Sequence, residues 1–480
     1  MLRKSVKLLT LLATIVACLA TVTASVRPSK LETVKMRGYI TVVTRNSPTT
    51  YFEDRGGKTG YEYELAQSFA DYLGVELRLN VADSIGEIYQ QLETGEADIA
   101  AAGLTQTDER QRWFRYATPY QTVSEVVVYK RGTRKPRELS ELPGKMMIVT
   151  ANSSHSWTLR QTQATELPSL SWSESADLDV TDLLHMVETG EIDFTLVDSN
   201  EFRLLQAYFP NVGTGITLSH EESQAWALPM SADQSLLEQT NQFFSERRTR
   251  QQLANLNERY YGHLGELDYV GAKRFLRQTS RKLDDYKPYF QSAAEKHSFD
   301  WRLLAAMGYQ ESHWNPTATS FTGVRGLMML TLGTASDLGV SDRLDAEQSI
   351  RGGSEYLAGL RRRLGSQVAE PDRTWMSLAA YNVGYGHLQD ARRLTYEMGG
   401  NPNLWRDVKD SLPLLSQRRY HKNTRHGYAR GHEAVDYVQN IRRYYDVLVW
   451  NEEQATAVAE QSTESEVQLS QSMTVIPPLL

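Results

Sequence analysis

The sequence predicts a two-part protein, an α/β domain with two lobes followed by a mainly α-helical domain. Its 480 residues are too many for one ordinary hydrophobic core, so two or three domains are expected. Short runs rich in β-branched residues alternate with helical patterns up to about residue 266, and from residue 267 the β-branched runs disappear. We therefore assign residues 25–266 to the α/β domain and residues 267–452 to the helical domain.

The elements of the α/β domain can be predicted in order from their residue patterns. Runs dominated by β-branched and alternating apolar residues predict strands. The predicted strands are YITVVTR (39–45), VELRLNV (75–81) and the extended segment EVVVYKRG (125–132). An amphipathic helix is expected at 61–74, ending at Gly74. Residues 145–154 open the second lobe, and helix is expected over 231–262.

A near-repeat supports the division of this domain into two lobes. LETGEADIAAAG (92–103) and VETGEIDFTLVD (187–198) share a helix end, a glycine turn at Gly95 or Gly190, and a short strand after an aspartate. Two matching helix–turn–strand units are what two α/β lobes of similar construction would contain.

Composition and charge exclude one class of partner. Hydrophobic residues make up 40% of the chain and charged residues 23%, and the formal net charge is −7. The chain has no lysine-rich tract, so the basic surface that nucleic acids require is not expected. The substrate should be neutral or recognised locally.

The first 24 residues have the pattern of a secretory signal peptide. Three basic residues precede an apolar run at 8–20, and small residues precede a cleavage point after Ala24. Two alternatives are lipid attachment at Cys18, which ends the lipobox-like IVAC, and an uncleaved anchor, although the run is short of the ~20 residues that span a membrane. Cys18 is the only cysteine, so no internal disulfide is expected.

The α/β domain resembles the periplasmic solute-binding proteins of the polar amino acid type. The motifs that carry the resemblance lie within residues 30–262 and its border: GYEYELAQSFADYLG, GEADIAAAGLTQTDERQRWFRYATPY and YYGH. The resemblance implies a non-catalytic, bilobed domain that binds an amino acid or a short peptide. It also implies that Thr107 and Arg110 hold a ligand carboxylate and that Asp198 receives an amino group. Arg110 offers the planar donor fork that suits a carboxylate. The alternative is that Arg110 and Asp198 form only surface or interlobe ion pairs.

The helical domain contains a glutamate in an unusual setting. Two helices are expected before residue 312, separated near Ser298, and Glu311 ends the second one ahead of a proline. Leu304 and Met307 share its helix face, so Glu311 lies on an apolar surface if the stretch is helical. An acid in such a place is a candidate proton donor.

The polar tail, residues 453–480, is expected to be disordered.

Four stretches, in order, resemble the signatures of the family 1 lytic transglycosylases, which share a lysozyme-like α fold. They are QESHWNP (310–316), GVRGLMMLT (323–331), LAAYNVGYGHL (378–388) and YARGHEAVDYVQNI (428–441). The second departs from the usual G-L-M-Q, because Met329 stands where the glutamine would be. With the solute-binding half, the whole chain resembles a membrane-bound type of these enzymes, attached peripherally to the outer membrane on its periplasmic side.

The resemblance implies a carbon–oxygen lyase acting on peptidoglycan with Glu311 as the single catalytic acid and base. Glycosidases ordinarily use two carboxylates, and Asp337, Asp342, Asp345 and Glu347 would be the candidates for the second. A lytic transglycosylase needs none, because the muramyl C6 hydroxyl attacks in place of water and leaves a 1,6-anhydro sugar. Two alternatives are a glycan-docked amino acid or peptide sensor and a muramidase that uses water.

Five further residues are implied to bind substrate, each with a structural alternative. Ser312 orients Glu311 or the substrate acetamido group, or else caps the helix. Tyr381 and Asn382 line the cleft, although Tyr381 could be core. Tyr437 lies near the acid or packs in the core, and Gly326 permits a close approach of glycan or backbone.

Neither a cofactor nor a metal is expected. His421, His426 and His432 do not have the spacing of a standard zinc site, and arginine, lysine and glycine surround them. A solvated loop is the expected setting for these three histidines.

Overall fold

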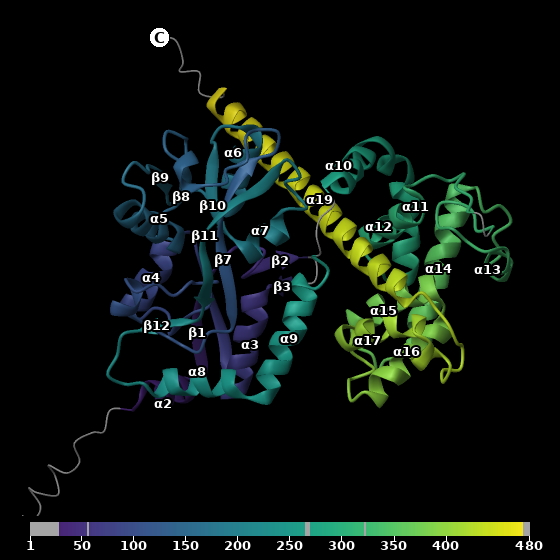
Figure 1. Cartoon of the computed structure of the whole chain (residues 1–480), viewed down its shortest axis with the longest axis horizontal. Coiled ribbons are helices and arrows are strands. Elements are labelled where there is room, and N and C mark those ends of the chain that lie inside the picture. Colours follow the sequence, from purple (N-terminus) through teal and green to yellow (C-terminus); the bar gives the residue numbers. More distant parts are fainter. Residues whose placement is uncertain (1–27, 55–56, 265–268, 321–322, 474–480) are drawn as a thin grey trace, which may run out of the picture. The chain divides into compact units, whose positions relative to one another are not determined.

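The computed structural model describes residues 28–54, 57–264, 269–320 and 323–473, drawn in colour in Figure 1. The chain forms two compact units. The first contains the residues up to Glu125, Val149–Asp179 and Ser219–Leu253, and the second contains Val126–Ile148, Val180–Leu218 and the residues from Ala254 onward. The predicted signal peptide, including Cys18, lies outside the described residues.

A five-stranded sheet with the order β4-β1-β5-β12-β6 forms the centre of the first unit. Its strands are β4 (Glu76–Ala82), β1 (Tyr39–Arg45), β5 (Ile99–Ala100), β12 (Ala227–Pro229) and β6 (Phe114–Tyr116). β1 pairs in parallel with β4 and β5, and β12 is antiparallel to β5 and β6. The strands predicted at 39–45 and 75–81 therefore pair with each other.

Helices α3 (Tyr61–Leu73) and α4 (Ile85–Thr94) pack against this sheet. Helix α3 ends where the sequence predicts, because Gly74 adopts a left-handed conformation with φ 73°, which a residue without a side chain reaches at little cost. Helices α2 (Lys30–Arg37) and α8 (Ser235–Ser245) also belong to this unit, and α8 is followed by α9 (Arg247–Tyr261).

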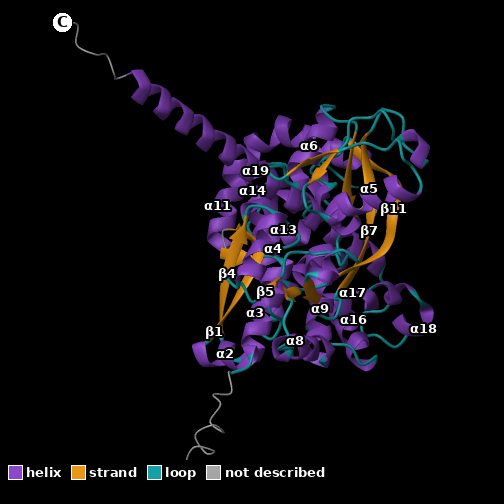
Figure 2. Ribbon diagram, turned by 90° about the vertical axis from the view of Figure 1, so that its left-hand side faces the viewer, coloured by secondary structure: helices purple, strands orange, loops and turns teal. Residues whose placement is uncertain are grey.

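The remaining strands form three smaller sheets, seen in orange in Figure 2. One has the order β10-β7-β11, from β10 (Phe194–Asp198), β7 (Gln121–Lys130) and β11 (Val212–Gln224). The other two pair β2 (Phe52–Asp54) with β3 (Gly57–Thr59) and β8 (Ile148–Thr150) with β9 (Ser173–Ser175). Helices α5 (Ser154–Thr165), α6 (Val180–Thr189) and α7 (Ser199–Leu205) alternate with these strands.

The near-repeat has the same local structure in both copies. Helix α4 and strand β5 surround Gly95, and α6 and β10 surround Gly190, with φ of 77° and 91° at the two glycines. The aspartates of the repeat also act alike: the Asp98 carboxylate accepts from the Thr41 N–H and the Asp193 carboxylate from the Met146 N–H, both at 2.9 Å. Each aspartate thus ties the repeat to the neighbouring strand region.

The described residues 269–320 and 323–473 are mainly helical. Their elements are α10 (Tyr269–Gln278), a π-helical turn (Thr279–Leu283), α11 (Asp284–His297), α12 (Trp301–Ser312), α13 (Leu332–Asp337), α14 (Ala346–Leu364), α15 (Asp372–Val383), α16 (Tyr385–Glu397), α17 (Trp405–Ser411), a 3₁₀ turn (Pro413–Ser416), α18 (Arg418–His421) and α19 (Gly431–Met473). As expected, α11 and α12 are separated at Ser298, which is left-handed. A large apolar core includes Leu304, Met307 and Trp314, all without exposed surface.

Helix α19 is the long helix that ends in yellow in Figure 1. It continues to Met473, so most of the tail predicted to be disordered is helical instead. The tail is rich in alanine, glutamate and glutamine and has no proline or glycine before residue 474, which favours a helix. Residues 474–480 lie outside the described part. Among the described residues, none of the helices has both the length and the apolar character needed to cross a membrane.

Candidate active site

Glu311 is the next-to-last residue of α12 and lies on the face of that helix predicted from the sequence. Asp300 caps the start of the helix, where its carboxylate accepts from the Arg302 N–H at 2.9 Å, and His313 after the last turn is left-handed with φ 53°. The Glu311 side chain is half-buried. Burial raises its pKa from the ordinary 4.5 to about 7, although a hydrogen bond from Tyr437 lowers it. Near neutral pH, Glu311 can therefore both give and take a proton.

Tyr437 is the hydrogen-bond donor to this carboxyl group. It lies on α19, is 5% exposed, and its hydroxyl donates to Glu311 Oε1 at 2.5 Å. Burial and the nearby negative charge of Glu311 hold the pKa of Tyr437 well above its ordinary value of 10. The hydroxyl therefore keeps its proton and remains a donor throughout the physiological pH range.

Tyr381 lies near the same carboxyl group but bonds elsewhere. It is on α15, and its hydroxyl donates to the Met328 carbonyl at 2.8 Å. Burial, and then the negative charge of Glu311, raise the pKa of Tyr381 well above 10, so this hydroxyl also stays protonated. Asn382 follows on the same helix and is exposed to solvent.

The second signature forms a tight loop next to these groups. Gly326 has φ of 89°, and a Cβ atom there would lie 1.8 Å from the carbonyl oxygen of Arg343, so only glycine fits this backbone approach. Met329, at the position of the family's glutamine, is also left-handed with φ 47°. The loop is closed by Leu330, whose N–H donates to the Arg325 carbonyl at 2.9 Å.

Ser312 connects the end of α12 to this loop. Its Oγ lies 2.8 Å from the Leu327 carbonyl oxygen and 3.2 Å from the Gly308 carbonyl oxygen, and it accepts from the Asn315 N–H at 3.1 Å. The hydroxyl is thus used to join backbone segments on either side of Glu311.

The four other carboxylates considered for catalysis, Asp337, Asp342, Asp345 and Glu347, are all exposed. Asp345 caps α14 by accepting from the Gln348 N–H at 2.8 Å, and Asp342 accepts from the Leu344 N–H at 2.9 Å. Glu311 differs from them in its burial.

Thr107 and Arg110, two of the residues implied to bind a ligand in the α/β domain, contact each other. Arg110 donates from its guanidinium to the carbonyl oxygens of Thr105, at 3.2 Å, and Asn152, and the guanidinium carbon lies 5.0 Å from the Tyr89 ring centre. The Thr107 hydroxyl accepts from the Arg110 N–H at 3.3 Å.

Asp198 is the last residue of β10 and directly precedes α7. It is 5% exposed. The strand before it is buried along its whole length, so the carboxylate stands at the end of an apolar segment.

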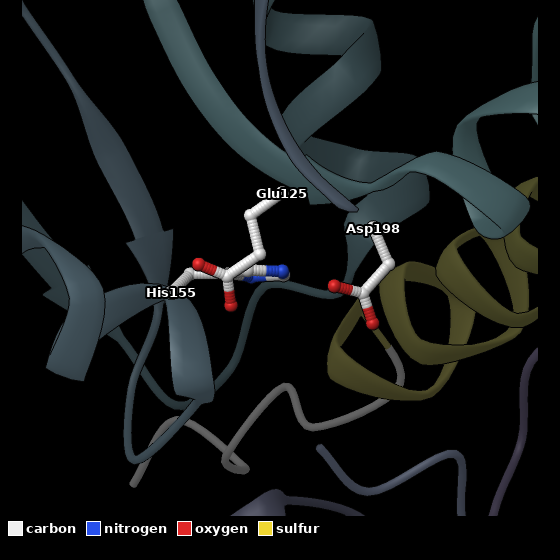
Figure 3. A group of neighbouring side chains, drawn as sticks. All are labelled: Glu125, His155 and Asp198. Atoms are coloured by element: carbon white, nitrogen blue, oxygen red, sulfur yellow. The ribbon is translucent and has the colours of Figure 1, made fainter. Parts of the chain in front are cut away.

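Two buried acidic residues were missed by the sequence reasoning. Glu62, in the first turn of α3, accepts from the Gly103 N–H at 2.9 Å, from the Trp226 indole N–H at 2.7 Å and from the Tyr120 hydroxyl. Glu125, in β7, lies in a group with His155 of α5 and Asp198 of β10, in which a carboxylate oxygen or ring nitrogen of each residue is within 4.8 Å of the others (Figure 3). The one signal for Glu125 is its place in an otherwise apolar strand, SEVVV.

The three histidines considered for a metal site lie in different surroundings. His421 ends α18, and its ring packs edge-on against Tyr428. His426 packs against His387, with ring centres 6.0 Å apart. His432 is exposed in the first turn of α19.

Comparison with known families gives two matches along the chain. Residues 40–263 match the bacterial extracellular solute-binding proteins, family 3. Residues 288–403 match the transglycosylase SLT domain, and this segment contains Glu311 and Tyr381.

Individual relatives cover nearly the whole chain. The chain is 47% identical to a membrane-bound lytic murein transglycosylase F of Saccharophagus degradans, over 90% of this chain and 86% of that protein. It is 43% identical to the protein of the same name from Hahella chejuensis, over 97% of this chain and 95% of that protein. The chain therefore belongs to the family of the membrane-bound lytic murein transglycosylases F.

Two solved structures are similar to about half of this chain. A variant of ArgBP from T. maritima is 24% identical with a TM-score of 0.43, over 48% of this chain and 99% of that one. An ancestral arginine-binding protein bound to arginine is 22% identical with the same TM-score, over 47% of this chain and 100% of that one.

Proposed function

We propose that the helical half cleaves the β-1,4 bond between N-acetylmuramic acid and N-acetylglucosamine in peptidoglycan and leaves 1,6-anhydromuramic acid ends. The observation that carries the proposal is the setting of Glu311: a half-buried carboxyl group with a pKa of about 7 and a hydrogen bond from Tyr437. A group poised near neutrality suits both halves of an acid–base reaction.

In the first step, protonated Glu311 gives its proton to the glycosidic oxygen while the bond from that oxygen to the muramyl C1 breaks. The N-acetylglucosamine fragment leaves with a new hydroxyl, and the substrate's own N-acetyl group stabilises the cationic carbon. In the second step, the Glu311 carboxylate takes the proton of the muramyl C6 hydroxyl as that oxygen bonds to C1. Glu311 ends protonated, as it began, so one residue is sufficient.

Tyr437 and Tyr381 support this cycle in different ways. The Tyr437 hydroxyl stabilises the carboxylate that exists between the two steps, which prevents burial from raising the pKa of Glu311 further. Tyr381 holds the second-signature loop through the Met328 carbonyl. Ser312 holds the same loop through the Leu327 carbonyl. Both contacts fix the backbone around the acid.

Mass spectrometry of the products from digested peptidoglycan tests the reaction. Anhydro ends are expected. Reducing ends would indicate a muramidase that uses water, and intact glycan would indicate a sensor that only binds. Digestion in ¹⁸O-labelled water adds a second readout, because the proposed reaction incorporates no solvent oxygen into the muramyl residue.

We further propose that the α/β half binds an amino acid or a short wall peptide, with Thr107 and Arg110 at its carboxylate and Asp198 at its amino group. Support comes from the match to the solute-binding family and from the buried setting of Asp198. The ligand carboxylate would take the place of the Asn152 carbonyl at the Arg110 guanidinium. Calorimetry with peptidoglycan-derived peptides tests this, and Arg110→Ala should abolish binding.

Helix α19 provides a route from such a ligand to the acid. Within the second unit, the Tyr208 ring stacks on Trp450 of α19 at 4.7 Å. At the end of α9, Arg442 of α19 donates to the Glu258 carboxylate at 3.1 Å and to the Glu258 carbonyl at 2.9 Å. The same helix carries Tyr437, so a shift of these segments on α19 changes the contact to Glu311.

The size of such a regulatory effect has a natural range. A ligand alters cleavage only if it favours one arrangement of the helix, and couplings of this kind are typically ~1–3 kcal/mol, or about 5–150-fold. Turnover at saturating ligand measures it. Trp450→Ala should weaken the response, whereas unchanged turnover in the wild type would reduce the α/β half to a spacer or localisation module.

Finally, we propose that the protein is exported and attached peripherally to the outer membrane on its periplasmic side. The signal-like segment and the membrane-bound relatives support this location. If cleavage follows Ala24, Cys18→Ala should leave membrane association unchanged in a fractionation experiment. Release of the variant into the soluble fraction would indicate lipid attachment at Cys18.

A further inference from the structure

A strongly basic loop precedes helix α19 in the helical half. Residues 418–432, which we call the basic loop, include α18 (Figure 2) and have the sequence RRYHKNTRHGYARGH. The loop contains no aspartate or glutamate, although the chain as a whole has a formal net charge of −7. Such a local excess of positive charge attracts anions to this part of the surface. Its basic side chains are all exposed, and they are Arg418, Arg419, Lys422, Arg425 and Arg430.

Most of these positive charges are not neutralised by neighbouring acids. Arg430 pairs with Glu433 of α19 at 3.2 Å. The Arg419 guanidinium carbon lies 4.6 Å from the centre of the Tyr420 ring, a contact that leaves the charge in place. Three further basic side chains form no salt bridge with another described residue, namely Arg418, Lys422 and Arg425. These charges are available to an anionic ligand.

Helix α16 holds the backbone of the basic loop in place. Asp390 of this helix is 3% exposed, and its carboxylate accepts from the backbone N–H groups of Arg425 at 3.1 Å and His426 at 2.7 Å. Arg393, about one turn further along α16, donates to the Asn423 carbonyl at 3.0 Å. The buried acid thus binds the backbone at Arg425, while the Arg425 side chain stays exposed. A loop that is fixed in advance loses little conformational entropy when it binds a ligand.

The basic loop adjoins the elements that carry the candidate active site. Helix α16 begins three residues after Asn382, and the His387 ring in its first turn packs against the His426 ring of the loop, with ring centres 6.0 Å apart. At its other end the loop continues into α19, where Tyr437 donates to Glu311. Tyr437 is six residues from the start of that helix, which is a rise of about 9 Å. Groups attached to a glycan at Glu311 can therefore reach the loop.

We infer that the basic loop binds carboxylates of the peptides attached to the glycan strand, so that the enzyme prefers peptide-bearing peptidoglycan to glycan without peptides. This inference rests on the proposed cleavage of peptidoglycan and narrows its substrate. Wall peptides end in a free carboxylate and contain acidic residues with further carboxylates. The lactyl carboxyl group of the muramyl residue is joined to the peptide as an amide, so in the intact polymer the peptides supply the negative charge.

The side chains of the basic loop suit such peptides. An arginine guanidinium offers a planar pair of N–H donors that matches the two oxygens of a carboxylate. Tyr428 is 56% exposed, and the His421 ring packs edge-on against it with ring centres 5.7 Å apart. The exposed tyrosine ring provides an apolar surface beside the charges, against which the methyl groups of a peptide can pack.

An anionic lipid surface is the alternative partner for a basic loop with an exposed aromatic ring. The position of the loop favours the wall peptide. Because the loop is tied to the start of α16 and to the start of α19, a bilayer docked on it would lie against the elements that must admit the glycan. A peptide on the glycan reaches the same place without this conflict.

Kinetics of the full-length protein on three forms of peptidoglycan test the inference. The forms are native peptidoglycan, native peptidoglycan whose peptide carboxylates have been converted to neutral amides, and glycan from which an amidase has removed the peptides. Wild type should have a KM roughly threefold to tenfold lower for the native form than for the other two, because exposed charge pairs are individually weak and several act together. The kcat should be the same for native and amidated forms, since proton transfer belongs to Glu311.

A double variant tests the residues. Lys422→Gln with Arg425→Gln removes two exposed charges and keeps polar side chains of similar length, so the unfolding temperature should not change. Its KM for native peptidoglycan should rise towards that for the amidated form, with kcat unchanged. High salt should weaken the preference of wild type for native peptidoglycan more than that of the variant. Arg247→Gln with Arg250→Gln, the same loss of charge at exposed positions of α9, is the matched control and should retain the preference.

The other outcomes separate this inference from the proposal on which it rests. Equal KM values of wild type for native and amidated peptidoglycan, or a full preference in the double variant of the loop, would overturn the inference and keep the proposed cleavage. A KM for peptide-free glycan as low as for native peptidoglycan would assign the loop to the lactyl carboxylate that the amidase frees. The absence of anhydro products from all three forms would overturn the cleavage itself. Binding to phosphatidylglycerol vesicles that the double variant loses, with equal KM values, would assign the loop to the membrane.

Discussion

Glu311 in the helical half and Glu62 in the α/β half are both glutamates removed from water, and they differ in how many donors surround them. Three groups donate to the Glu62 carboxylate, and its side chain is 1% exposed. Glu311 is half-buried, and among the described residues Tyr437 is its one hydrogen-bond partner. Burial raises the pKa of both. A raised pKa therefore does not distinguish a catalytic acid from a structural one.

The difference in hydrogen bonding does distinguish them. The lone pairs of Glu62 are used inside the protein, so this carboxylate joins α3 to the segments that contain Gly103, Tyr120 and Trp226. Glu311 retains acceptor capacity and some exposure, so a substrate oxygen can approach it. We interpret Glu62 as a structural junction and Glu311 as a reactive group.

The largest expected effect is on catalysis. Glu311→Gln should abolish cleavage with the fold intact, because the amide is nearly isosteric but cannot donate and recover a proton. General acid–base catalysis typically increases a rate by a factor of roughly 10²–10⁴, and here one group provides it in both steps. Release of anhydro products measures the loss. Glu62→Gln should cleave at a rate close to wild type at a temperature where it is folded. More than a tenth of wild-type activity in Glu311→Gln would place the catalytic role elsewhere.

The sequence predicted the helical site better than the α/β site for a physical reason. The signatures around Glu311 and Tyr437 carry local chemistry, so each residue could be named, although the two are 126 positions apart and their hydrogen bond required the fold. The partner of Ser312 is a backbone carbonyl, which has no residue-specific signal in a sequence. Glu125 and His155 come together only when a strand and a helix pack.

Domain-level features were also predictable to different extents. The near-repeat predicted two helix–turn–strand units, and both formed around left-handed glycines. The tail after residue 452 was judged by its polar composition, and composition alone did not reveal that α19 continues into it. A helix that starts in a packed core can extend into a polar segment of good helix formers.

The second prediction concerns stability and gives the two glutamates opposite signs. The folded-state pKa of Glu311 is about 7, above its ordinary 4.5, so wild-type stability falls as pH rises from about 4.5 through 7. This increase in the pKa of Glu311 corresponds to at most about 3 kcal/mol of stability. Screening by solvent at this half-buried group makes the actual effect smaller. Glu311→Gln lacks this penalty. Its free energy of unfolding should exceed that of wild type at pH 8, and the gain should shrink towards pH 5. Denaturant titrations at both pH values measure it, and a loss of stability at pH 8 would contradict the burial argument.

The same substitution at the structural junction should destabilise the protein. Glu62→Gln replaces an acceptor oxygen by an NH₂ group, which must face a donor such as the Trp226 indole N–H. Leaving a buried donor without its acceptor costs about 1–3 kcal/mol. Denaturant titration at pH 7 should show this loss. Stability equal to wild type would mean that the three donors do not hold Glu62 as a junction.

The smallest expected effect is a shift in the pH dependence of cleavage. The first step needs protonated Glu311, so the rate should fall above a pH of about 7. The Tyr437 hydrogen bond lowers the pKa of Glu311 by stabilising the carboxylate. Tyr437→Phe removes that bond, so the pKa should rise and the alkaline fall in rate should move to higher pH, by about one unit if the bond is worth ~1.5 kcal/mol.

Rates measured from pH 5 to pH 9 on both proteins test this shift. Tyr445→Phe provides the matched control, because it is the same change on α19 at a tyrosine whose hydroxyl donates to Asp300 instead, at 3.1 Å. This control should keep the wild-type pH profile.

The other outcomes would contradict the proposed role of Tyr437. If Tyr437→Phe is slower at every pH but its rate falls at the same alkaline pH as wild type, Tyr437 serves only to position the glycan. A fall that moves to lower pH would contradict the role of the hydroxyl as a donor to the carboxylate. Only an upward shift confined to Tyr437→Phe ties the acid strength of Glu311 to the hydrogen bond from Tyr437.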